Sequence, residues 1–431
     1  MPVSQDLAGQ RIKTIRRQRG MSQAQLAHPE LSDSYVSLIE SGKRTPTPAV
    51  LELLAGKLDC SLSYLVNGVT AEQMEELELE LGYARMALEN GEVAEARRRY
   101  AALVADNDLA GLAQLRLDAE FGLARAMEAG GDLDAAIATL NGLRASAGEA
   151  MTPERHVEVA IALSRCYRER GDLSAAVQVC EQILMGSARP AWTDELIELG
   201  ATLLYAYHFR GDLLRATQFC AELFAAAELL GTPRAIVATC WNGALLAEAT
   251  NQKEEALALA ERALAIHSEN GDPRNLARVR LAYTYLRFRI RPEEAESCRE
   301  ALLRSQQELA GTSAGSADQA RCERELGRVE FALGNYDQAV VHAQKAHDLV
   351  SETINGLGVE PQLLLSGAYA VLGKRAEAHE AIDSAKRWLD NVTPARRAAQ
   401  GWRTVAEVLG KLDDRPGSVA AYQRALTSVG L

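Results

Sequence analysis

The sequence predicts an all-α protein with two parts: a bundle of five short helices at the N-terminus and a long array of helical hairpins after it. Ala and Leu, which both favour helix, are abundant, and aromatic residues make up only 5% of the chain. Helix-capping residues recur at short intervals up to residue 68. Beyond that point, a turn recurs about every 40 residues, and its first four copies begin with glycine.

The composition limits the class of protein. The chain has 431 residues, which is too long for one ordinary domain. No apolar run approaches the roughly 20 residues that a membrane-spanning helix needs. Residues 1–10 lack the apolar segment of a signal peptide. We therefore expect a cytoplasmic protein that does not bind membranes.

Sequence patterns typical of catalysis or metal binding are missing. The chain contains no phosphate-binding loop, no GxGxxG, no HExxH and no nucleophile elbow. His342 and His347 have the wrong spacing for two metal ligands on one helix face. The seven cysteines form no CxxC pair, so we expect buried thiols. We predict no enzymatic activity, no metal and no cofactor.

The charge distribution favours a nucleic-acid contact at the N-terminus. The whole chain has a net charge of −12, which on its own argues against such a partner. Residues 1–44, however, contain seven Lys or Arg and only four Asp or Glu. A basic segment on an acidic protein can contact phosphate while the acidic remainder stays away from the duplex.

Capping signals predict five helices before residue 68. Gly20 ends the first helix, and Ser22 with Gln25 in capping-box spacing begins the second. Ser32 caps the third, which Gly42 ends. The predicted helices span residues 7–19, 22–27, 32–41, 48–58 and 61–66. The residues expected in their shared core include Leu26, Val36 and Ile39.

The second and third of these helices, joined by a tight turn, resemble the helix-turn-helix of the lambda-repressor-like (XRE-type) family. The resemblance covers residues 6–68 and is carried by residues 11–27 and 34–46. In this family the third helix enters the major groove of double-stranded DNA. The resemblance implies a DNA-binding surface made of Gln23, Ser32, Asp33, Ser34, Tyr35, Ser37, Leu38, Ser41, Lys43 and Arg44.

The resemblance also implies separate roles within that surface. Gln23 would meet a phosphate or a base. The family often has Gln or Arg where this chain has Asp33, and Asp accepts from cytosine N4 but is repelled by phosphate. A plain helical bundle with solvated basic residues is the alternative. The implied base readers are Asp33, Ser34, Ser37 and Leu38, and the implied phosphate contacts are Ser41, Lys43 and Arg44.

The chain repeats itself beyond residue 70, where we place the boundary between domains 1–69 and 70–431. A glycine or asparagine can end a helix in the left-handed conformation, and an aspartate just after it can cap the next helix. A fixed period of this length is typical of a solenoid. The turns lie at Gly91, Gly131, Gly171, Gly211, Asn251, about Arg291, Gly334, Gly373 and Asp413, and the expected caps are Asp132, Asp172 and Asp212.

These repeats resemble tetratricopeptide (TPR) units, although their period exceeds the usual value of about 34 residues. A small residue occurs on the first helix at Ala124, Ser164 and Gly327, and the family's aromatic residue is kept at Tyr167 and Tyr207. The resemblance covers residues 72–431 as about nine hairpins. It implies a right-handed TPR-like α-solenoid, which is strong evidence of architecture and weak evidence of function.

TPR geometry exposes certain positions of each first helix on a concave face. Many of these positions hold arginine, which binds carboxylates through two parallel hydrogen bonds. Others hold aromatic residues, which serve as apolar anchors. We expect a groove for a peptide or another ligand with a carboxylate, and pairing of the arginines with nearby Glu is the open alternative. The predicted ligand-binding residues are Arg125, Arg165, Arg168, Tyr205, Trp241, Asn242, Arg280, Arg287, Arg324 and Arg328.

The domain order, a helix-turn-helix followed by TPR repeats, resembles that of the peptide-pheromone receptors of Gram-positive bacteria. That resemblance implies homodimers, palindromic operators and control by a short peptide, with Asn242 and Asn275 as candidate clamps. We expect a sequence-specific transcriptional regulator whose TPR domain dimerises and senses a peptide or small ligand. The alternatives are a regulator that binds a small metabolite, and a TPR scaffold that docks a protein partner and keeps a vestigial helix-turn-helix.

Overall fold

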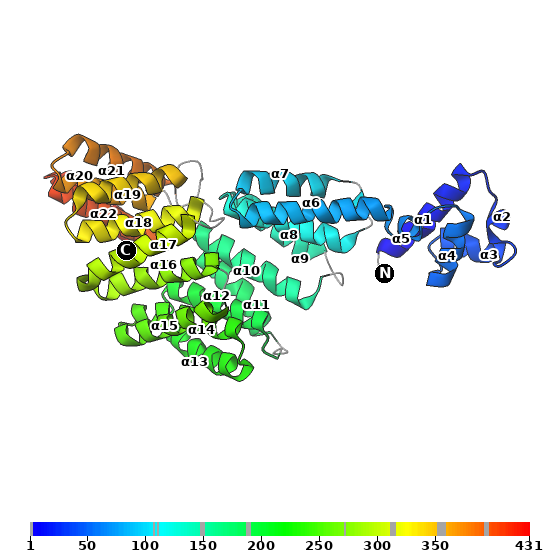
Figure 1. Cartoon of the computed structure of the whole chain (residues 1–431), viewed down its shortest axis with the longest axis horizontal. Helices are drawn as coiled ribbons and strands as arrows, with labels where there is room; N and C mark the ends of the chain where they lie inside the picture. Colours follow the sequence, from blue (N-terminus) through cyan, green and yellow to red (C-terminus); the bar gives the residue numbers. More distant parts are fainter. Residues whose placement is uncertain are drawn as a thin grey trace. The chain divides into compact units, whose positions relative to one another are not determined.

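The fold is built from helices, and no strand occurs in the part of the chain that the structure describes. The structure is a computed structural model, and the predicted all-α class is confirmed (Figure 1). The chain divides into two compact units: Met1–Leu88 with Val93–Ala126 and Ala145–Met151, and Glu89–Glu92 with Met127–Arg144 and Thr152–Leu431. The described residues are 3–106, 108–109, 112–146, 151–186, 191–270, 273–310, 316–350, 359–391 and 396–431.

Five short helices form the N-terminal bundle of the first unit, as the caps predicted. Their ends agree with the predicted ones to within about two residues, except that the first helix begins four residues earlier, at Val3. Leu26, Val36 and Ile39, the expected core residues, are almost fully buried among other apolar side chains of the bundle. The helices are α1 (Val3–Gln18), α2 (Gln23–Ala27), α3 (Asp33–Glu40), α4 (Pro48–Lys57) and α5 (Leu62–Asn67).

Close backbone approaches and long side chains hold this bundle together. A Cβ atom at Gly9 of α1 would lie 2.2 Å from the carbonyl oxygen of Ile39, so only glycine lets α1 pack this closely against α3. Lys57 Nζ at the end of α4 donates to the carbonyl oxygen of His28, 2.7 Å away, and thereby caps the C-terminus of α2. Arg11 Nη1 donates to the carbonyl oxygen of Val66, 2.7 Å away, at the end of α5.

Three further helices continue the first unit: α6 (Ala71–Glu89), α7 (Val93–Ala105) and most of α8 (Ala113–Ala129). The predicted domain boundary near residue 70 falls on the segment between α5 and α6. Tyr100 of α7 packs so closely on Gly122 of α8 that a Cβ there would meet the tyrosine ring at 2.1 Å. Glycine on α8 thus makes room for the aromatic ring of α7.

The second unit contains most of α9 (Leu133–Ser146) and then successive antiparallel hairpins, of which α18/α19 and α20/α21 lie side by side (Figure 1). We call the first helix of each hairpin the A helix and the second the B helix. The hairpins are α10/α11 (Pro153–Arg170, Leu173–Leu184), α12/α13 (Asp194–Arg210, Leu213–Leu230), α14/α15 (Pro233–Ala249, Lys253–Asn270), α16/α17 (Pro273–Ile290, Ala295–Ala310), α18/α19 (Ser316–Ala332, Tyr336–Val350), α20/α21 (Val359–Val371, Arg375–Asp390) and α22/α23 (Arg396–Lys411, Arg415–Thr427).

Most of the predicted turns have the left-handed backbone that ends a helix. The φ angle is positive at all of the listed turn positions except Arg291. There φ is −127°, and a short 3-10 helix, η3 (Pro292–Glu294), replaces the usual turn because proline follows directly. Asp172 Oδ1 accepts from the backbone N of Ala175 at 3.0 Å, as predicted. The predicted cap at Asp212 is wrong, because its carboxylate accepts from Arg210 Nε at 2.7 Å instead.

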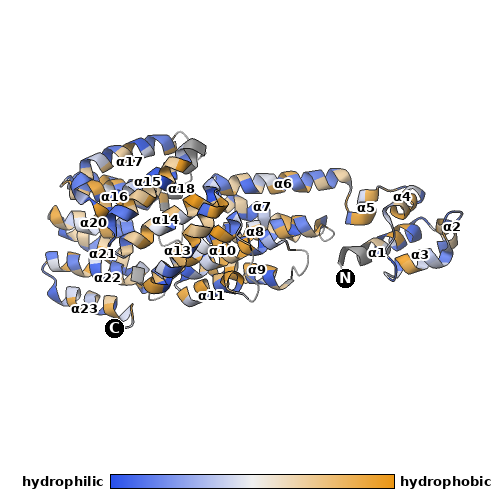
Figure 2. Ribbon diagram, turned by 90° about the horizontal axis from the view of Figure 1, so that it is seen from below, coloured by the Kyte–Doolittle hydropathy of each residue, from blue (hydrophilic) through white to orange (hydrophobic). Residues whose placement is uncertain are grey.

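Small buried residues let the two helices of a hairpin approach each other. Ala176 and Ala339 at the start of B helices are fully buried. Ser164 on α10 donates through Oγ to the carbonyl oxygen of Ala176, 2.9 Å away, so its hydroxyl is satisfied inside the interface. Figure 2 shows apolar and polar residues alternating along the helices, which is the pattern of amphipathic helices with one face in the core.

The A helices of the second unit contact one another in two runs, from α10 to α14 and from α16 to α22. Contacts join α10 to α12, α12 to α14, α16 to α18, α18 to α20 and α20 to α22. Side chains on these helices therefore meet across hairpins as well as within them. These helices contain most of the residues that the sequence proposed for ligand binding.

Ion pairs link neighbouring hairpins at about one repeat distance. Arg170, at the end of α10, pairs with Asp134 at the start of α9, 36 residues away. Arg291, just after α16, pairs in the same way with Glu254 at the start of α15, 37 residues away. The nitrogen–oxygen distances are 2.9 Å and 2.6 Å. The two acceptors occupy equivalent positions in their hairpins, and the two donors differ by one position.

The cysteines are free thiols, and all except the half-buried Cys60 are buried. Burial raises the pKa of Cys180 to about 12, so this thiol stays protonated at neutral pH. Among the described helices, none is both long and apolar enough to span a bilayer.

Candidate functional site

Helix α3 has one buried face and one exposed polar face. Val36, Ile39 and Glu40 are buried, with at most 5% of their surface accessible. Leu38 is the large apolar residue of the exposed face, and it is 38% accessible. An exposed apolar side chain among hydroxyls is suited to a thymine methyl group. The exposed residues along α3 and its flanks are Ser32, Asp33, Ser34, Ser37, Leu38 and Ser41.

Both ends of α3 are capped, which fixes the direction of the helix. Ser32 Oγ accepts from the backbone N of Tyr35 at 3.2 Å. At the other end Gly42 adopts a φ of 73°, and the backbone N of Lys43 donates to the carbonyl oxygen of Leu38 at 2.9 Å. This Schellman motif turns the chain sharply after α3.

The turn after α3 leaves two cationic side chains exposed beside the helix. Lys43 and Arg44 are both exposed, and the Arg44 guanidinium carbon lies 5.4 Å from the centre of the Tyr35 ring. This stacking of a cation over an aromatic face holds Arg44 against the α3 side of the bundle. The exposed polar face of α3 and these two cations together form the candidate nucleic-acid interface.

A buried ion pair joins the inner face of α3 to α1. Arg16 of α1 donates through Nε and Nη2 to the two carboxylate oxygens of Glu40, at 2.5 Å and 2.9 Å. The Glu40 side chain is only 2% accessible. Burial on its own would raise the pKa of Glu40, but hydrogen bonds from Arg16 and Gln23 outweigh it and hold that pKa below its ordinary value. Glu40 therefore stays ionised at neutral pH.

Gln23, a predicted DNA contact, is joined to this ion pair. Its Nε2 donates to Glu40 Oε2 at 2.8 Å, which links α2 to α3. Its contact with DNA stays a prediction. Sequence reasoning missed the roles of Arg16 and Glu40, although two charged residues at otherwise apolar helix positions were a visible signal.

Comparison with known proteins finds a family match in each of the two parts of the chain. Residues 12–65 match the helix-turn-helix family model, and residues 118–147 match the tetratricopeptide repeat model. The immunity repressor protein of Bacillus phage phi105 is 41% identical over 71 residues, which are 16% of this chain and 49% of that protein. The match thus spans about half of the relative's length. The chain carries an XRE-type helix-turn-helix domain followed by tetratricopeptide repeats, as the sequence predicted.

Solved structures support the fold of the repeat region. A Rap protein complexed with competence and sporulation factor has a TM-score of 0.54 and 12% identity, over 82% of this chain and 98% of that chain. At this identity the likeness shows the fold alone, and it confirms the TPR-like solenoid. PlcR of Bacillus thuringiensis, in complex with the peptide PapR7 and DNA, gives a TM-score of 0.38 and 17% identity, over 61% of this chain and 95% of that chain. A likeness this distant does not bear on the fold.

The predicted ligand-binding arginines lie mostly on A helices and have carboxylate partners. Arg125 belongs to the first unit, and the other nine predicted residues belong to the second. Arg165 Nε and Nη2 each lie 2.7 Å from an oxygen of Glu128. Arg280 pairs with Glu308, and Arg287 with Glu294. The alternative that the sequence left open, pairing with nearby Glu, therefore describes several of these side chains.

Contacts other than ion pairs involve Arg168, Tyr205, Trp241 and Asn242 of the predicted set. The Arg168 guanidinium carbon lies 4.6 Å from the centre of the Tyr205 ring. Trp241 packs against the apolar core of hairpin α14/α15 and the end of α16. Asn242 Nδ2 donates to the carbonyl oxygen of Ala238, one turn earlier, at 2.9 Å. The Asn275 side chain lies outside the described part of the structure. Ligand binding by this set stays a prediction.

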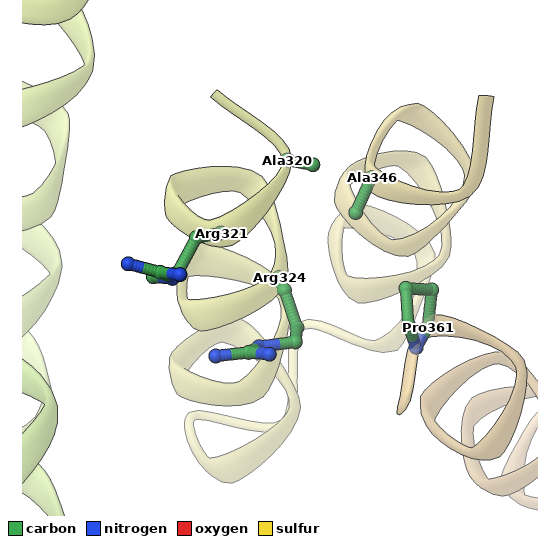
Figure 3. Close-up of a pocket in the computed structure, with 5 residues that line it drawn as sticks. All are labelled: Ala320, Arg321, Arg324, Ala346 and Pro361. Atoms are coloured by element: carbon green, nitrogen blue, oxygen red, sulfur yellow. The ribbon is translucent and has the colours of Figure 1, made fainter. Parts of the chain in front are cut away.

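One arginine that the sequence reasoning did not select stands out on α18. Arg321 is exposed and has no hydrogen bond or ion pair to any residue that the structure describes. It lies beside Ala320, Arg324, Ala346 and Pro361 at a shallow depression of the surface. Figure 3 shows that the Arg321 and Arg324 guanidinium groups leave the same side of α18, away from Ala346 and Pro361.

Proposed function

We propose that this protein is a sequence-specific DNA-binding transcriptional regulator of the cytoplasm, whose TPR region dimerises and senses a peptide or small ligand. The observation that carries the proposal is the geometry of α3. Its outer face is polar and exposed, two cations follow it, and a buried ion pair fixes it from behind. The phage protein that matches this segment is an immunity repressor, which supports DNA binding by the segment.

In this proposal α3 reads bases and its C-terminal turn meets phosphates. The hydroxyls of Ser34 and Ser37 can donate to or accept from base edges in the major groove, and Leu38 can contact a thymine methyl group. Lys43 and Arg44 approach the backbone, where they position the protein without reading sequence. Asp33 accepts from cytosine N4 and disfavours any register that brings a phosphate close to it.

A dimer is part of the proposal because one bundle of this size contacts few phosphates. Two bundles held by the TPR region read half-sites about 34–36 Å apart, one turn of the duplex. A ligand on the repeat region then changes DNA affinity only if it binds the two arrangements of the dimer unequally. Light scattering with and without DNA tests this step, and a monomer under both conditions would contradict it.

The central experiment is selection of bound fragments from sheared genomic DNA, followed by affinity measurement on the recovered site. The wild-type protein is expected to enrich a palindromic sequence. Replacing Ser34 and Ser37 together by Ala is expected to remove about 1–3 kcal/mol of discrimination for each lost base contact. The matched control is Ser428→Ala, at the residue that follows α23 near the C-terminus, and it should bind like the wild type. Enrichment of no fragment, even at low salt, would contradict DNA binding and favour the scaffold alternative.

A further inference from the structure

Helix α18, one of the A helices, carries a charged stripe. Arg321, Arg324, Glu325 and Arg328 are spaced by three, four and seven residues from the first, so they share one face of the helix. Neighbouring A helices bring further charges to this face. Asp318 pairs with Arg278 of α16, and Glu360 of α20 pairs with Arg324 and Arg328.

The carboxylates of this cluster are fully engaged. Glu325 is 1% accessible and accepts from Arg324 Nη2 at 2.6 Å and from Arg328 Nη1 at 3.2 Å. Glu360 Oε2 lies 2.5 Å from Arg324 Nη1 and 3.3 Å from Arg328 Nη2. Asp318 Oδ2 accepts from Arg278 Nε at 2.7 Å and from its Nη2 at 2.6 Å. None of these three carboxylates pairs with Arg321.

The cluster therefore holds four guanidinium groups and three carboxylates, and the surplus positive charge lies on Arg321. Desolvation lowers the pKa of Arg321, and the positive charges of Arg324 and Arg278 lower it further, while the negative charges of Asp318 and Glu325 offset only part of this shift. The group stays ionised, because an arginine pKa begins far above neutrality. Its surroundings thus disfavour its charge while its donors remain accessible.

We infer that Arg321 on α18 binds the carboxylate of the ligand that the TPR region senses. The guanidinium presents a planar pair of donors that matches the two oxygens of a carboxylate. Arg324 acts as a positioning residue: Glu325 and Glu360 occupy its donors, so it contributes charge rather than a direct contact. A bound carboxylate would balance the surplus charge. This inference rests on the proposed function, and it names the ligand class and the residue that takes it.

A test can use the full-length protein with three probes at constant ionic strength: succinate, N-acetylated tetra-alanine with a free C-terminal carboxylate, and the same peptide as its C-terminal amide. We expect one of the carboxylate probes, but not the amide, to raise the melting temperature of the wild-type protein. A response to succinate alone assigns the carboxylate to a free organic acid. A response to the acid peptide assigns it to a peptide.

The variant Arg321→Gln is expected to weaken this binding about 10-fold or more, because hydrogen bonds to charged groups contribute more than neutral ones. Its melting temperature without probe should equal or exceed that of the wild type, since an unbalanced charge is removed. The matched control is Arg304→Gln on α17, an arginine whose side chain is 75% accessible. This control should respond to the probes like the wild type.

Two outcomes would overturn the inference: a wild-type protein that responds to none of the probes, and an Arg321→Gln variant that keeps the full response. DNA binding measured on the same preparations separates the two proposals. Loss of the carboxylate response with DNA binding intact contradicts only the inference about Arg321. A carboxylate response without DNA binding contradicts only the regulatory function.

Discussion

The N-terminal bundle and the α18 cluster use the same chemical groups in different ways. On the buried face of α3, the Arg16 guanidinium pairs with the Glu40 carboxylate, and the two charges compensate each other inside the protein. On α18, three carboxylates serve four guanidinium groups, and the remaining one faces outward. The first arrangement fixes the position of α3, whose exposed face belongs to the candidate nucleic-acid interface. The second leaves a cationic group available to an external anion.

The largest effect is expected when the buried ion pair between Arg16 and Glu40 loses its carboxylate. Glu40→Ala leaves Arg16 buried without its partner, which should cost about 3–5 kcal/mol of stability. Hydrogen exchange of the α3 amides should accelerate, and DNA binding should be lost with the position of α3. The control Glu52→Ala, on the exposed side of α4, should exchange like the wild type. Unchanged protection of α3 in Glu40→Ala would contradict the anchoring role.

A steric change should have a smaller effect on the same helix. Gly9→Ala places a Cβ atom 2.2 Å from the Ile39 carbonyl oxygen, so α1 must move away from α3. Overpacking of this kind costs about 1–3 kcal/mol. The matched control is Gly56→Ala on α4, where a Cβ meets nothing within 4 Å and helix propensity should add up to about 1 kcal/mol. Equal thermal stability of the two variants would show that the α1–α3 contact is not tight.

Removing a cation beside α3 should change how DNA binding depends on salt. Lys43→Ala is expected to reduce the slope of log affinity against log salt by about 0.9, the value for one lost phosphate contact on duplex DNA. Sequence preference should stay the same, because phosphates carry no base information. The control Lys411→Ala, an exposed lysine on α22, should keep the wild-type slope. A wild-type slope for Lys43→Ala would place Lys43 away from the duplex.

The smallest expected effect is the pH dependence of the stability that the Arg16–Glu40 ion pair contributes. The pKa of Glu40 is lowered in the folded protein, so its ionised form stabilises the fold above the pKa of an unfolded glutamate, about 4.3. As the pH falls below that value and passes through the folded pKa, this contribution is lost. The difference in melting temperature between the wild type and Glu40→Gln should therefore shrink on acidification. A constant difference down to about pH 3 would contradict this linkage.

The elements that sequence reasoning predicted well are those fixed by neighbours along the chain. The capping box of Ser22 with Gln25, the ends of α3 and the turns of the repeats each depend on residues within about five positions. A cap with a competing partner is harder to predict: Asp212 accepts from Arg210 and so leaves the backbone of α13 uncapped.

The pairing of charges was harder to predict because the partners are distant in sequence. Arg165 meets Glu128 37 residues away, and Arg16 meets Glu40 24 residues away. Composition and spacing show that arginines occupy the A helices, but they do not show which ones lack a carboxylate. That Arg321 has no carboxylate partner among the described residues could be recognised only from the partners of Arg324 and Arg328 on the same and neighbouring helices.

The ion pairs that join the end of one A helix to the start of the preceding B helix have a consequence for how the array changes length. A link of this kind occurs at Arg170 with Asp134 and at Arg291 with Glu254, whose donors differ by one position in the repeat. Loss of the three complete hairpins from α10/α11 to α14/α15 would bring Arg291 opposite Asp134 at the new junction. Loss of a single helix would place a donor opposite a donor instead of an acceptor. Such a chain is therefore expected to gain or lose whole hairpins.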